Sequence, residues 1–563
     1  MSRATSEVID EFLAAFWARN PVTATFAGVH AHDARLPDWS SAGRAAEVAE
    51  LRALSARLAA HAVPGDWRAL AADPVALDAL VAQAVARVRV AEVESGFFTA
   101  RNPALWTGEA IFGAVSLMLR DFAPVADRVA SLTARLAAVP GFLDTMRREI
   151  TGGVPAAWTA RALRECGAAQ QLLGEGLALW LGAHGAAPAT DGLRHAAQSA
   201  AEAFAGAASW LRTLPVDDTG AACGETLLSL LLRDGHLTDE SPRALLARVD
   251  AALPEALRAL EDALAPYGGS LAAAREAMAN DHEAPADFVA AFGARWDAVR
   301  DAVVAADVVP WPHDWPLRYV PIPVWARAVQ PQLYFLFYRS PAPFDPYTVH
   351  EYLVAPVDAS TPAEPAQATM RAWNRSVIGT NHVLHHGGLG HHVQNRMAAR
   401  GHSRLGMVTA VDAASRIAMF QGGSMAEGWA CYATQLAGEL GLLTPLEQIS
   451  EAHSAVRFLG RAIIDLRLHL GDWTASACAR FLVDTVHMDE AQAAGEVTKA
   501  SMFPGTALMY WMGTEGIVRT RAALQQAQGP AFSLRRFHEA LLERGALPVP
   551  LVSRLLLAAE DVA

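Results

Sequence analysis

The chain has 563 residues, of which 52% are hydrophobic and 19% are charged. This composition is typical of a globular protein of roughly two to four domains, or of one large domain with a helical body, and it excludes bulk disorder. The formal net charge of −13 argues against a protein that binds nucleic acid by neutralising phosphates.

The N-terminal segment and the cysteines predict a cytoplasmic protein. Glu7, Asp10 and Glu11 interrupt the apolar run that a signal peptide needs. No stretch of about 18 uncharged apolar residues occurs, so we expect no membrane-spanning segment. The four cysteines are scattered and never form a CxxC pair, which is typical of buried thiols in a reducing compartment.

Residues 1 to about 305 are rich in alanine and leucine, with recurrent arginine and acidic residues. In VADRVASLTARLAAVPGFLDTMRREI (125–150) the apolar positions recur every three or four residues, which is the period of an amphipathic helix. Pro140 and Pro254 are expected at helix starts or breaks. The first half of the chain is therefore predicted to be helical.

Prolines and aromatic residues gather between Val308 and Asp358. Within this stretch, LYFLFY (333–338) and EYLVAPV (351–357) are short and rich in aromatic and β-branched residues, with proline and aspartate around them. These features indicate strands and loops, so a small sheet is expected here. The helical pattern resumes after about residue 365 and continues to the C-terminus.

These patterns together predict a mainly α protein with a small β-sheet. Because the composition changes near residue 306, we expect a helical N-terminal domain of residues 1–305. A second domain of residues 306–563 would hold the sheet, the candidate metal site and the C-terminal helices. No repeat of fixed period occurs, so a solenoid is not expected.

The most informative segment is NHVLHHGGLGHHVQ (381–394), which contains five histidines. Chance would place about 0.4 histidine in the 11 positions that hold them, given 19 in the whole chain. Neutral imidazole is the commonest protein ligand of zinc and similar metals. The cluster therefore predicts a metal site, although a group of surface or core histidines beside a flexible glycine loop is the plainer alternative.

The spacing of the histidines supports this site only in part. His382 and His386 lie at i and i+4, as in helical metallopeptidase motifs. His385 and His391 are six residues apart, with three glycines between them. Because glycine in a helix interior costs about 1 kcal/mol relative to alanine, the glycines suggest a kink or bulge that brings these two histidines to one metal.

A second cue lies in QGGSMAEGWACYATQLAGELG (421–441). A carboxylate at Glu427 would complete a His/His/Glu set, the usual three-ligand arrangement of catalytic zinc with a fourth position open. However, Ser424 and Glu427 also have the S-x-x-E spacing of a capping box, so Glu427 would equally serve to cap its own helix.

At these two segments the chain resembles the bacterial family known as domain of unknown function 885, grouped with gluzincin-like metallopeptidases. The hallmark H-E-x-x-P-G-H-H-x-Q, followed by E-G-W-A-x-Y-A, is represented here by HHGGLGHHVQ and EGWACYA. The similarity extends along the chain, through residues 21–40, 139–150, 504–513 and 537–551.

The resemblance implies a mostly helical zincin-like metallopeptidase architecture with a deep groove and an edge strand from residues 333–357. It also implies that His385 and His391 are paired metal ligands and that Glu427 is the third, with His392 as the competing choice for the second. The implied cofactor is zinc, or another divalent transition metal such as manganese or iron.

Several residues depart from the family pattern. The glutamate that normally follows the first ligand histidine, and that acts as general base in zincins, is replaced by His386. The proline before the Gly-His pair is Leu389, and the glutamine of the C-terminal P-G-Q-A motif is Thr506. The R-Y pair that precedes this motif is Lys499–Ala500. These positions are predicted to face the site.

The sequence therefore predicts a metal-dependent hydrolase that acts on a peptide or a small amide. His386 would serve as base, and Tyr510 would stabilise the oxyanion unless it is a core aromatic. In one alternative, His386 is a fourth ligand of a metal centre with altered, non-hydrolytic chemistry. In the other, the protein is an inactive, peptidase-like binding protein, because loss of a general base typically costs about 10²–10⁴-fold in rate.

Overall fold

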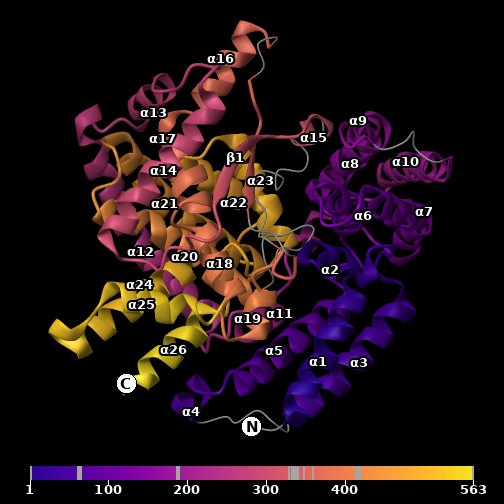
Figure 1. The fold of residues 1–563 in the computed structure, drawn as a ribbon, viewed down its shortest axis with the longest axis horizontal. Helices are drawn as coiled ribbons and strands as arrows, with labels where there is room; N and C mark the ends of the chain where they lie inside the picture. Colours follow the sequence, from indigo (N-terminus) through magenta and orange to yellow (C-terminus); the bar gives the residue numbers. More distant parts are fainter. Residues whose placement is uncertain are drawn as a thin grey trace.

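Helices make up most of the described structure. This computed structural model describes residues 3–59, 66–185, 191–327, 330, 342–345, 349–357, 361–411 and 420–560. Figure 1 shows the helices of the first 200 residues, in indigo and purple, beside a second group in magenta, orange and yellow that contains the later elements. The mainly helical fold class is thus confirmed.

The first half of the chain forms helices joined by short turns, as its amphipathic period predicts. They are α1 (Arg3–Arg19), α2 (Pro21–Ala27), η1 (His30–His32), α3 (Ser41–Ala59), α4 (Trp67–Ala71), α5 (Pro74–Glu94), α6 (Pro103–Met118), α7 (Val125–Glu149), α8 (Ala156–Gln171), η2 (Leu172–Gly176), α9 (Leu177–Ala183), α10 (Asp191–Leu211), η3 (Asp218–Ala221), α11 (Glu225–Leu230), η4 (Leu231–Gly235), α12 (Pro242–Leu264), η5 (Ala265–Tyr267), α13 (Leu271–Asn280) and α14 (Phe288–Ala306). Many begin at a side-chain cap, such as Asp73 before α5, which accepts hydrogen bonds from the amides of Val75 and Ala76.

The second half adds two strands and a further set of helices. The elements are β1 (Leu317–Pro321), α15 (Val324–Arg327), β2 (His350–Val354), α16 (Ala363–Ala372), α17 (Arg375–Val377), η7 (Ile378–Gly387), α18 (His391–Ala399), α19 (Arg404–Val408), α20 (Phe420–Glu439), α21 (Pro445–His469), α22 (Ala475–Asp484), α23 (Glu490–Met502), α24 (Met509–Gln528), η8 (Gly529–Ala531), α25 (Leu534–Leu542) and α26 (Val549–Ala559). The segments η2, η4 and η7 have the wider turn of a π-helix.

The two prolines expected at helix starts or breaks lie inside continuous helices instead. Pro140 is within α7 and Pro254 is within α12. An interior proline removes one backbone hydrogen bond and costs about 3 kcal/mol. Buried side chains on both sides of Pro140, among them Leu136 and Leu143, pack in the core, and their burial outweighs that cost.

The small sheet consists of β1 and β2, which pair in parallel with Leu317 opposite His350 and Pro321 opposite Val354. A small sheet was predicted, and β2 covers the first four residues of the expected strand at residues 351–357. The strand β1 was not predicted, and the expected strand at 333–338 lies outside the described residues. Tyr319 of β1 donates a hydrogen bond to the carbonyl of His382 at 3.0 Å, so the sheet packs directly on η7.

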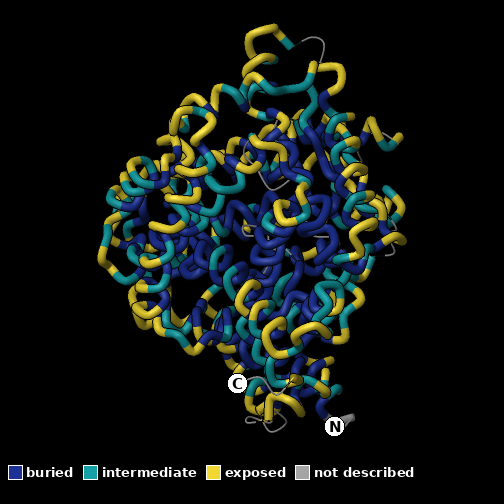
Figure 2. The backbone as a smooth tube through the Cα atoms, turned by 90° about the vertical axis from the view of Figure 1, so that its left-hand side faces the viewer, coloured by how far each residue is buried: buried dark blue, intermediate teal, exposed yellow. Residues whose placement is uncertain are grey.

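Buried backbone fills the centre of the molecule, and exposed backbone lies at its periphery (Figure 2). The largest group of contacting buried hydrophobic side chains includes members from Val8 to Leu556. A second group joins α12 to α21 and α22, and includes Leu245 and Ile463. Because the first group includes residues before and after 306, elements of both segments pack around a shared core. The division into domains 1–305 and 306–563 stays a prediction.

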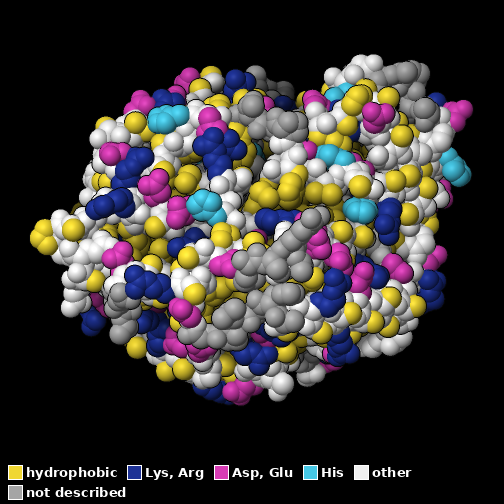
Figure 3. Space-filling model, turned by 60° about the horizontal axis from the view of Figure 1, so that its bottom comes forward, with side chains coloured by type: hydrophobic (Ala, Val, Ile, Leu, Met, Phe, Trp, Pro, Cys, Tyr) yellow, Lys and Arg dark blue, Asp and Glu magenta, His cyan; other side chains and the backbone are white. Residues whose placement is uncertain are grey.

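Charges of both signs are interspersed with apolar side chains over the face in Figure 3. None of the helices in the described part of the chain combines the length and apolar character that crossing a bilayer requires. All four cysteines are free thiols, and those at positions 166, 431 and 478 are buried.

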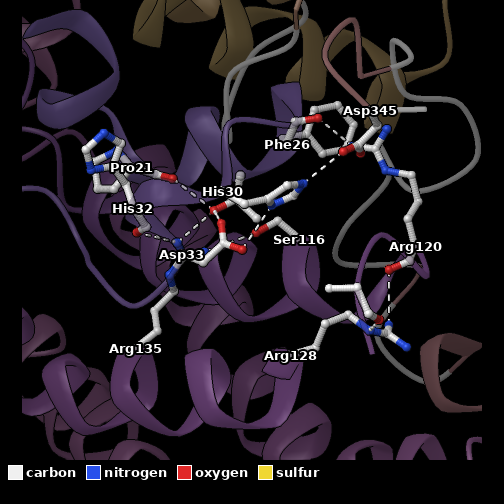
Figure 4. A network of polar contacts seen from close by, with 12 residues as sticks. Pro21, Phe26, His30, His32, Asp33, Ser116, Arg120, Arg128, Arg135 and Asp345 are labelled. Carbon is white, nitrogen blue, oxygen red and sulfur yellow. Dashed lines mark hydrogen bonds and ion pairs between the residues drawn. The ribbon is translucent and has the colours of Figure 1, made fainter. Parts of the chain in front are cut away.

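A polar network connects the α2–η1 turn to residue 345 (Figure 4). The ring of His30 contacts Asp33 through Nδ1 at 2.9 Å and Asp345 through Nε2 at 2.8 Å, and it stacks on Phe122. Burial opposes protonation of this imidazole, but the hydrogen bonds to the two carboxylates outweigh it and raise the pKa of His30 to about 9. The protonated ring therefore joins two segments that are distant in sequence.

This network predicts pH-dependent stability. The stabilisation from His30 should be fully present below its unfolded pKa of about 6.5 and lost as pH rises through about 9. Replacing His30 by Gln should lower the free energy of unfolding by about 1 kcal/mol at pH 6, because the site is partly exposed. The difference should vanish at pH 10 in denaturant titrations of both proteins. An equal difference at both pH values would contradict this account.

Candidate metal centre

The π-helix η7 sets the direction of the first two histidines of the cluster. Its wider turn places His385 and His386 on the last turn before the glycine segment, where both are buried. The sheet fixes this helix: Tyr319 contacts its backbone, and the hydroxyl of Tyr352 shares a hydrogen bond with Nδ1 of His382. The distortion that the glycines suggested is thus present, and it begins before them.

The glycine segment then turns the chain so that α18 begins at His391. A Cβ atom on Gly390 would lie 1.8 Å from the carbonyl oxygen of His385, a distance that no side chain tolerates. Glycine is therefore required there by close approach of two backbone segments, at a negative φ of −80°. This approach brings His391 back beside His385, with ring centroids 4.9 Å apart.

Glu427 lies beside His385 and His391, and it projects from the interior of α20. The capping-box alternative is wrong, because Ser424 and Glu427 both lie inside this helix, which begins at Phe420. The hydroxyl of Ser424 instead accepts a hydrogen bond from the amide of Val549 at 3.0 Å. The carboxylate of Glu427 is therefore available to a ligand and is not used to cap a helix.

The residues after Glu427 hold α20 in position. A Cβ on Gly428 would lie 2.5 Å from the backbone of Gly513, so the glycines let α20 and α24 cross in close contact. Trp429 donates a hydrogen bond from its indole to the carbonyl of Leu389 at 2.9 Å, which ties α20 to the glycine segment. Tyr432 shares a hydrogen bond with His538 at 2.8 Å. The EGWACYA motif thus supplies one carboxylate and its structural support.

The distances between these side chains suit a tetrahedral metal. Oε2 of Glu427 lies 3.2 Å from Nε2 of His385 and 3.6 Å from Nε2 of His391. Zinc bonds of about 2.0–2.2 Å at tetrahedral angles require ligand atoms about 3.3–3.6 Å apart. Ring nitrogens of His385, His386 and His391 also lie within 4.8 Å of one another.

The carboxylate of Glu427 supports the same fit. It is 1% exposed, and neither of its oxygens accepts a hydrogen bond within the part of the chain that the structure describes. A buried carboxylate without hydrogen bonds is costly unless a cation compensates it. Burial raises its pKa, but His391 and His385 outweigh that effect and hold the pKa of Glu427 well below its usual range. The ionised form suited to a metal is therefore favoured.

A hydrogen bond to the backbone determines which ring nitrogen of His386 carries the proton. Its Nδ1 lies 2.6 Å from the carbonyl oxygen of Asn381, which only accepts, so Nδ1 carries the proton and donates it. Nε2 then holds the lone pair that either a metal ligand or a general base needs. Burial and the nearby His385 and His391 hold the pKa of His386 well below its usual range, which favours the neutral ring.

The other two histidines of the cluster turn away from Glu427. Nε2 of His392 donates to the carbonyl of Trp315 at 2.8 Å. His382 stacks on Trp373, with ring centroids 4.3 Å apart. Of the two candidates for second ligand, the structure therefore brings His391 to the carboxylate and leaves His392 in the core.

A cavity of about 900 Å³ opens onto this cluster. His385, His386, Glu427 and Tyr510 line it, whereas His391 lies behind them. Tyr510 is stacked against Phe458, with ring centroids 5.1 Å apart. Its hydroxyl oxygen accepts a hydrogen bond from the ammonium of Lys499 at 3.4 Å. The predicted site residues thus share one cavity wall or lie directly behind it. Lys499, one of the residues that differ from the family pattern, also faces the cavity, as expected.

Sequence reasoning missed the contribution of α21 to this wall. Glu451, Ser454, Arg457, Phe458 and Arg461 all line the cavity from this helix. The four polar ones among them (451, 454, 457 and 461) recur every three or four residues, and this polar stripe on one face of the helix is the signal that could have identified them. Thr506 lies outside the cavity wall, and its hydroxyl donates to the carbonyl of Phe503.

Two solved structures resemble the whole chain. One is a candidate lipoprotein of unknown function from Shewanella oneidensis, with 19% identity and a TM-score of 0.76, covering 99% of this chain and 100% of that one. The other is a candidate lipoprotein from Colwellia psychrerythraea, with 16% identity and a TM-score of 0.72, covering 99% of each chain. At these identities the likeness shows a shared fold and nothing about activity.

Comparison of sequences identifies the family. No protein with a curated description matches the chain. A family model described as "bacterial protein of unknown function (DUF885)" matches residues 21–556, which include both histidine-rich and EGW segments. The chain therefore belongs to the bacterial DUF885 family.

Proposed function

We propose that the protein is a metal-dependent hydrolase of peptide or amide bonds, related to zincin-type metallopeptidases. The observation that carries this proposal is the buried carboxylate of Glu427, which accepts no hydrogen bond from other described residues and lies 3.2 and 3.6 Å from two imidazole nitrogens. His385, His391 and Glu427 would hold the ion, with zinc as the first candidate and manganese or iron as others. The adjoining cavity gives a substrate access to the cluster.

The chain's own residues supply the remaining parts of the reaction. A divalent metal ion would supply Lewis-acid polarisation of the scissile carbonyl and acidify the attacking water. His386 accepts a proton from that water at Nε2 and passes it to the leaving amine as the C–N bond breaks. Tyr510 donates a hydrogen bond to the carbonyl oxygen as negative charge develops on it. Water is thereby added across the amide bond, which yields a carboxylate and an amine.

The direct test is hydrolysis of a broad peptide and acyl-amide library by the purified full chain. We expect cleavage of some members with zinc, manganese or iron present, loss of cleavage on chelation, and recovery when the metal is restored. Failure to cleave any member under metal-loaded conditions would contradict the proposed activity and favour an inactive, peptidase-like binding protein.

Tyr510 provides a sharper prediction about the mechanism. Phe at position 510 keeps the ring stacked on Phe458 but removes the hydroxyl, so the fold and the metal content should be unchanged. Loss of one oxyanion donor is expected to lower kcat about 10²–10³-fold with little effect on KM. Steady-state kinetics of Tyr510→Phe measures this. An unchanged kcat would mean that Tyr510 is only a core aromatic.

The close approach of three imidazoles favours one alternative role for His386. Its ring nitrogen lies within 4.8 Å of those of His385 and His391, so it would act as a fourth ligand without large movement. A centre with four protein ligands leaves no open position for water, and its chemistry would be structural or non-hydrolytic. Substitution of His386, described in the Discussion, separates the two roles.

A further inference from the structure

The wall of the cavity carries an arginine, Arg457, that has no hydrogen-bond or ion-pair partner among the residues that the structure describes. Arg457 lies on α21, and its Nε is buried without a hydrogen bond. No hydrogen bond or ion pair to its guanidinium occurs among the described residues. The side chain as a whole is partly exposed to the cavity. A partly buried cation without a partner is costly, and arginine has a planar fork of donors that matches a carboxylate. Arg457 is therefore positioned for an anionic ligand group.

The charges around Arg457 do not neutralise it. The neighbouring Arg461 donates to Glu496 and covers the ring of Tyr510, with its guanidinium carbon 5.0 Å from the centroid. Lys499 donates to the hydroxyl of Tyr510. Arg275, Asp489 and Glu496 also contribute to the field at Arg457. Burial lowers the pKa of Arg457 to about 10, which leaves it charged at neutral pH.

Arg457 lies on the wall of the same cavity as the candidate metal centre. Its neighbour Phe458 lies between the rings of His385 and Tyr510, with centroid distances of 6.5 and 5.1 Å. Arg461 is one helical turn further along α21, at the base of the cavity beside Tyr510. Arg457 lines the same cavity as His385, His386 and Glu427, and the cavity volume of about 900 Å³ suits a molecule of a few residues.

We propose that Arg457 binds the free carboxylate of the substrate, so that the enzyme acts on short substrates such as dipeptides and N-acyl amino acids. This inference rests on the proposed function for its catalytic part, and the binding part stands by itself. The guanidinium holds the carboxylate through paired charge-assisted hydrogen bonds, and the amide next to that carboxylate then lies at the candidate metal centre. Long peptides whose termini lie far from the cleaved bond are excluded.

The test compares ligands that differ only in the carboxylate. Binding of N-benzoylglycine and the N-acetyl derivatives of leucine, phenylalanine and glutamate to the full chain would be measured by calorimetry, each beside its carboxamide. The measurements would be made on zinc-loaded and on chelator-treated protein. We expect at least one acid to bind in both states and about 10–100-fold more tightly than its amide.

Variants assign the effect to Arg457. Arg457→Gln should weaken binding of the acid about 10–100-fold in both states and leave binding of the amide unchanged, and Arg457→Lys should restore part of the loss. Arg480→Gln, an exposed position on α22 with the same change of charge, is the control and should have no effect. Circular dichroism would verify that each variant is folded.

Each outcome bears on one claim. Equal binding of acids and amides, failure of every acid to bind, or acid binding that survives Arg457→Gln would overturn the inference. Acid binding that requires zinc but not Arg457 would overturn it while supporting the metal centre. Binding that depends on Arg457 in a chain that takes up no metal would support the carboxylate site and contradict the proposed hydrolase.

Discussion

Replacing Glu427 by Gln is expected to abolish metal binding and amide hydrolysis together. Gln keeps the shape of the side chain but removes the negative charge that lies between the imidazoles of His385 and His391. Loss of a charged ligand should weaken zinc affinity by more than about a hundredfold, and hydrolysis should fall with it. Zinc titration followed by calorimetry, with kinetics on the same samples, measures both effects.

The effect of metal on stability is a second measurement that distinguishes Glu427→Gln from the wild type. With metal at about 1,000 times its Kd, the wild-type chain should gain about 4 kcal/mol of stability, and Glu427→Gln should gain almost none. In chelator the variant should be at least as stable as the wild type, because it no longer buries a charge without hydrogen bonds. Glu451→Gln, which changes another carboxylate in the same cavity, is the matched control and should retain metal. A metal-induced shift that persists in Glu427→Gln would refute its role as ligand.

Replacing His386 by Gln is expected to lower the rate of hydrolysis without loss of metal. The substitution removes the ring nitrogen that is proposed to accept the proton, in a cavity whose other groups are unchanged. A general base typically contributes about 10²–10⁴-fold, so hydrolysis by His386→Gln should fall within that range while zinc content stays constant. His386→Glu supplies the carboxylate base of the family hallmark and should recover the rate, whereas a rate far above that of the wild type would mean that His386 is not a base and that the chain is a decayed peptidase. Kinetics on a substrate of the wild-type enzyme, with metal analysis of the same preparation, gives the result.

Two other outcomes would assign His386 differently. If His386→Gln loses zinc, then His386 is a ligand and the centre has four protein donors. If zinc content and rate both stay unchanged, neither role holds. His382→Gln is the control, because His382 belongs to the same π-helix but contacts Tyr352 and Trp373 in place of the cluster.

The helical class, the small sheet and the residues of the cluster could be predicted because they depend on local signals. Periodicity predicted the helices, and the density of histidines with the EGW motif pointed to the segments that meet. The prolines within α7 and α12 were misjudged because tertiary packing outweighs a local cost. The role of Ser424 stayed open in the sequence because its partner, Val549, is distant along the chain.

Other features of the site depend on contacts that no single segment encodes. That His391 faces Glu427 while His392 faces Trp315 follows from the crossing of η7, α18 and α20. The sequence does not show that α21 forms part of the cavity wall, because this depends on the packing of α21 beside Tyr510. Its unpaired cation, Arg457, lies in a sequence that looks like an ordinary amphipathic helix.

The central claim is that His385, His391 and Glu427 bind a metal ion, and metal analysis tests it most directly. The full chain would be purified without added metal and without a histidine tag, then examined by inductively coupled plasma mass spectrometry. We expect about one equivalent of zinc, manganese or iron per chain, and none in Glu427→Gln. A metal-free chain that also takes up none of these ions on titration would contradict the account.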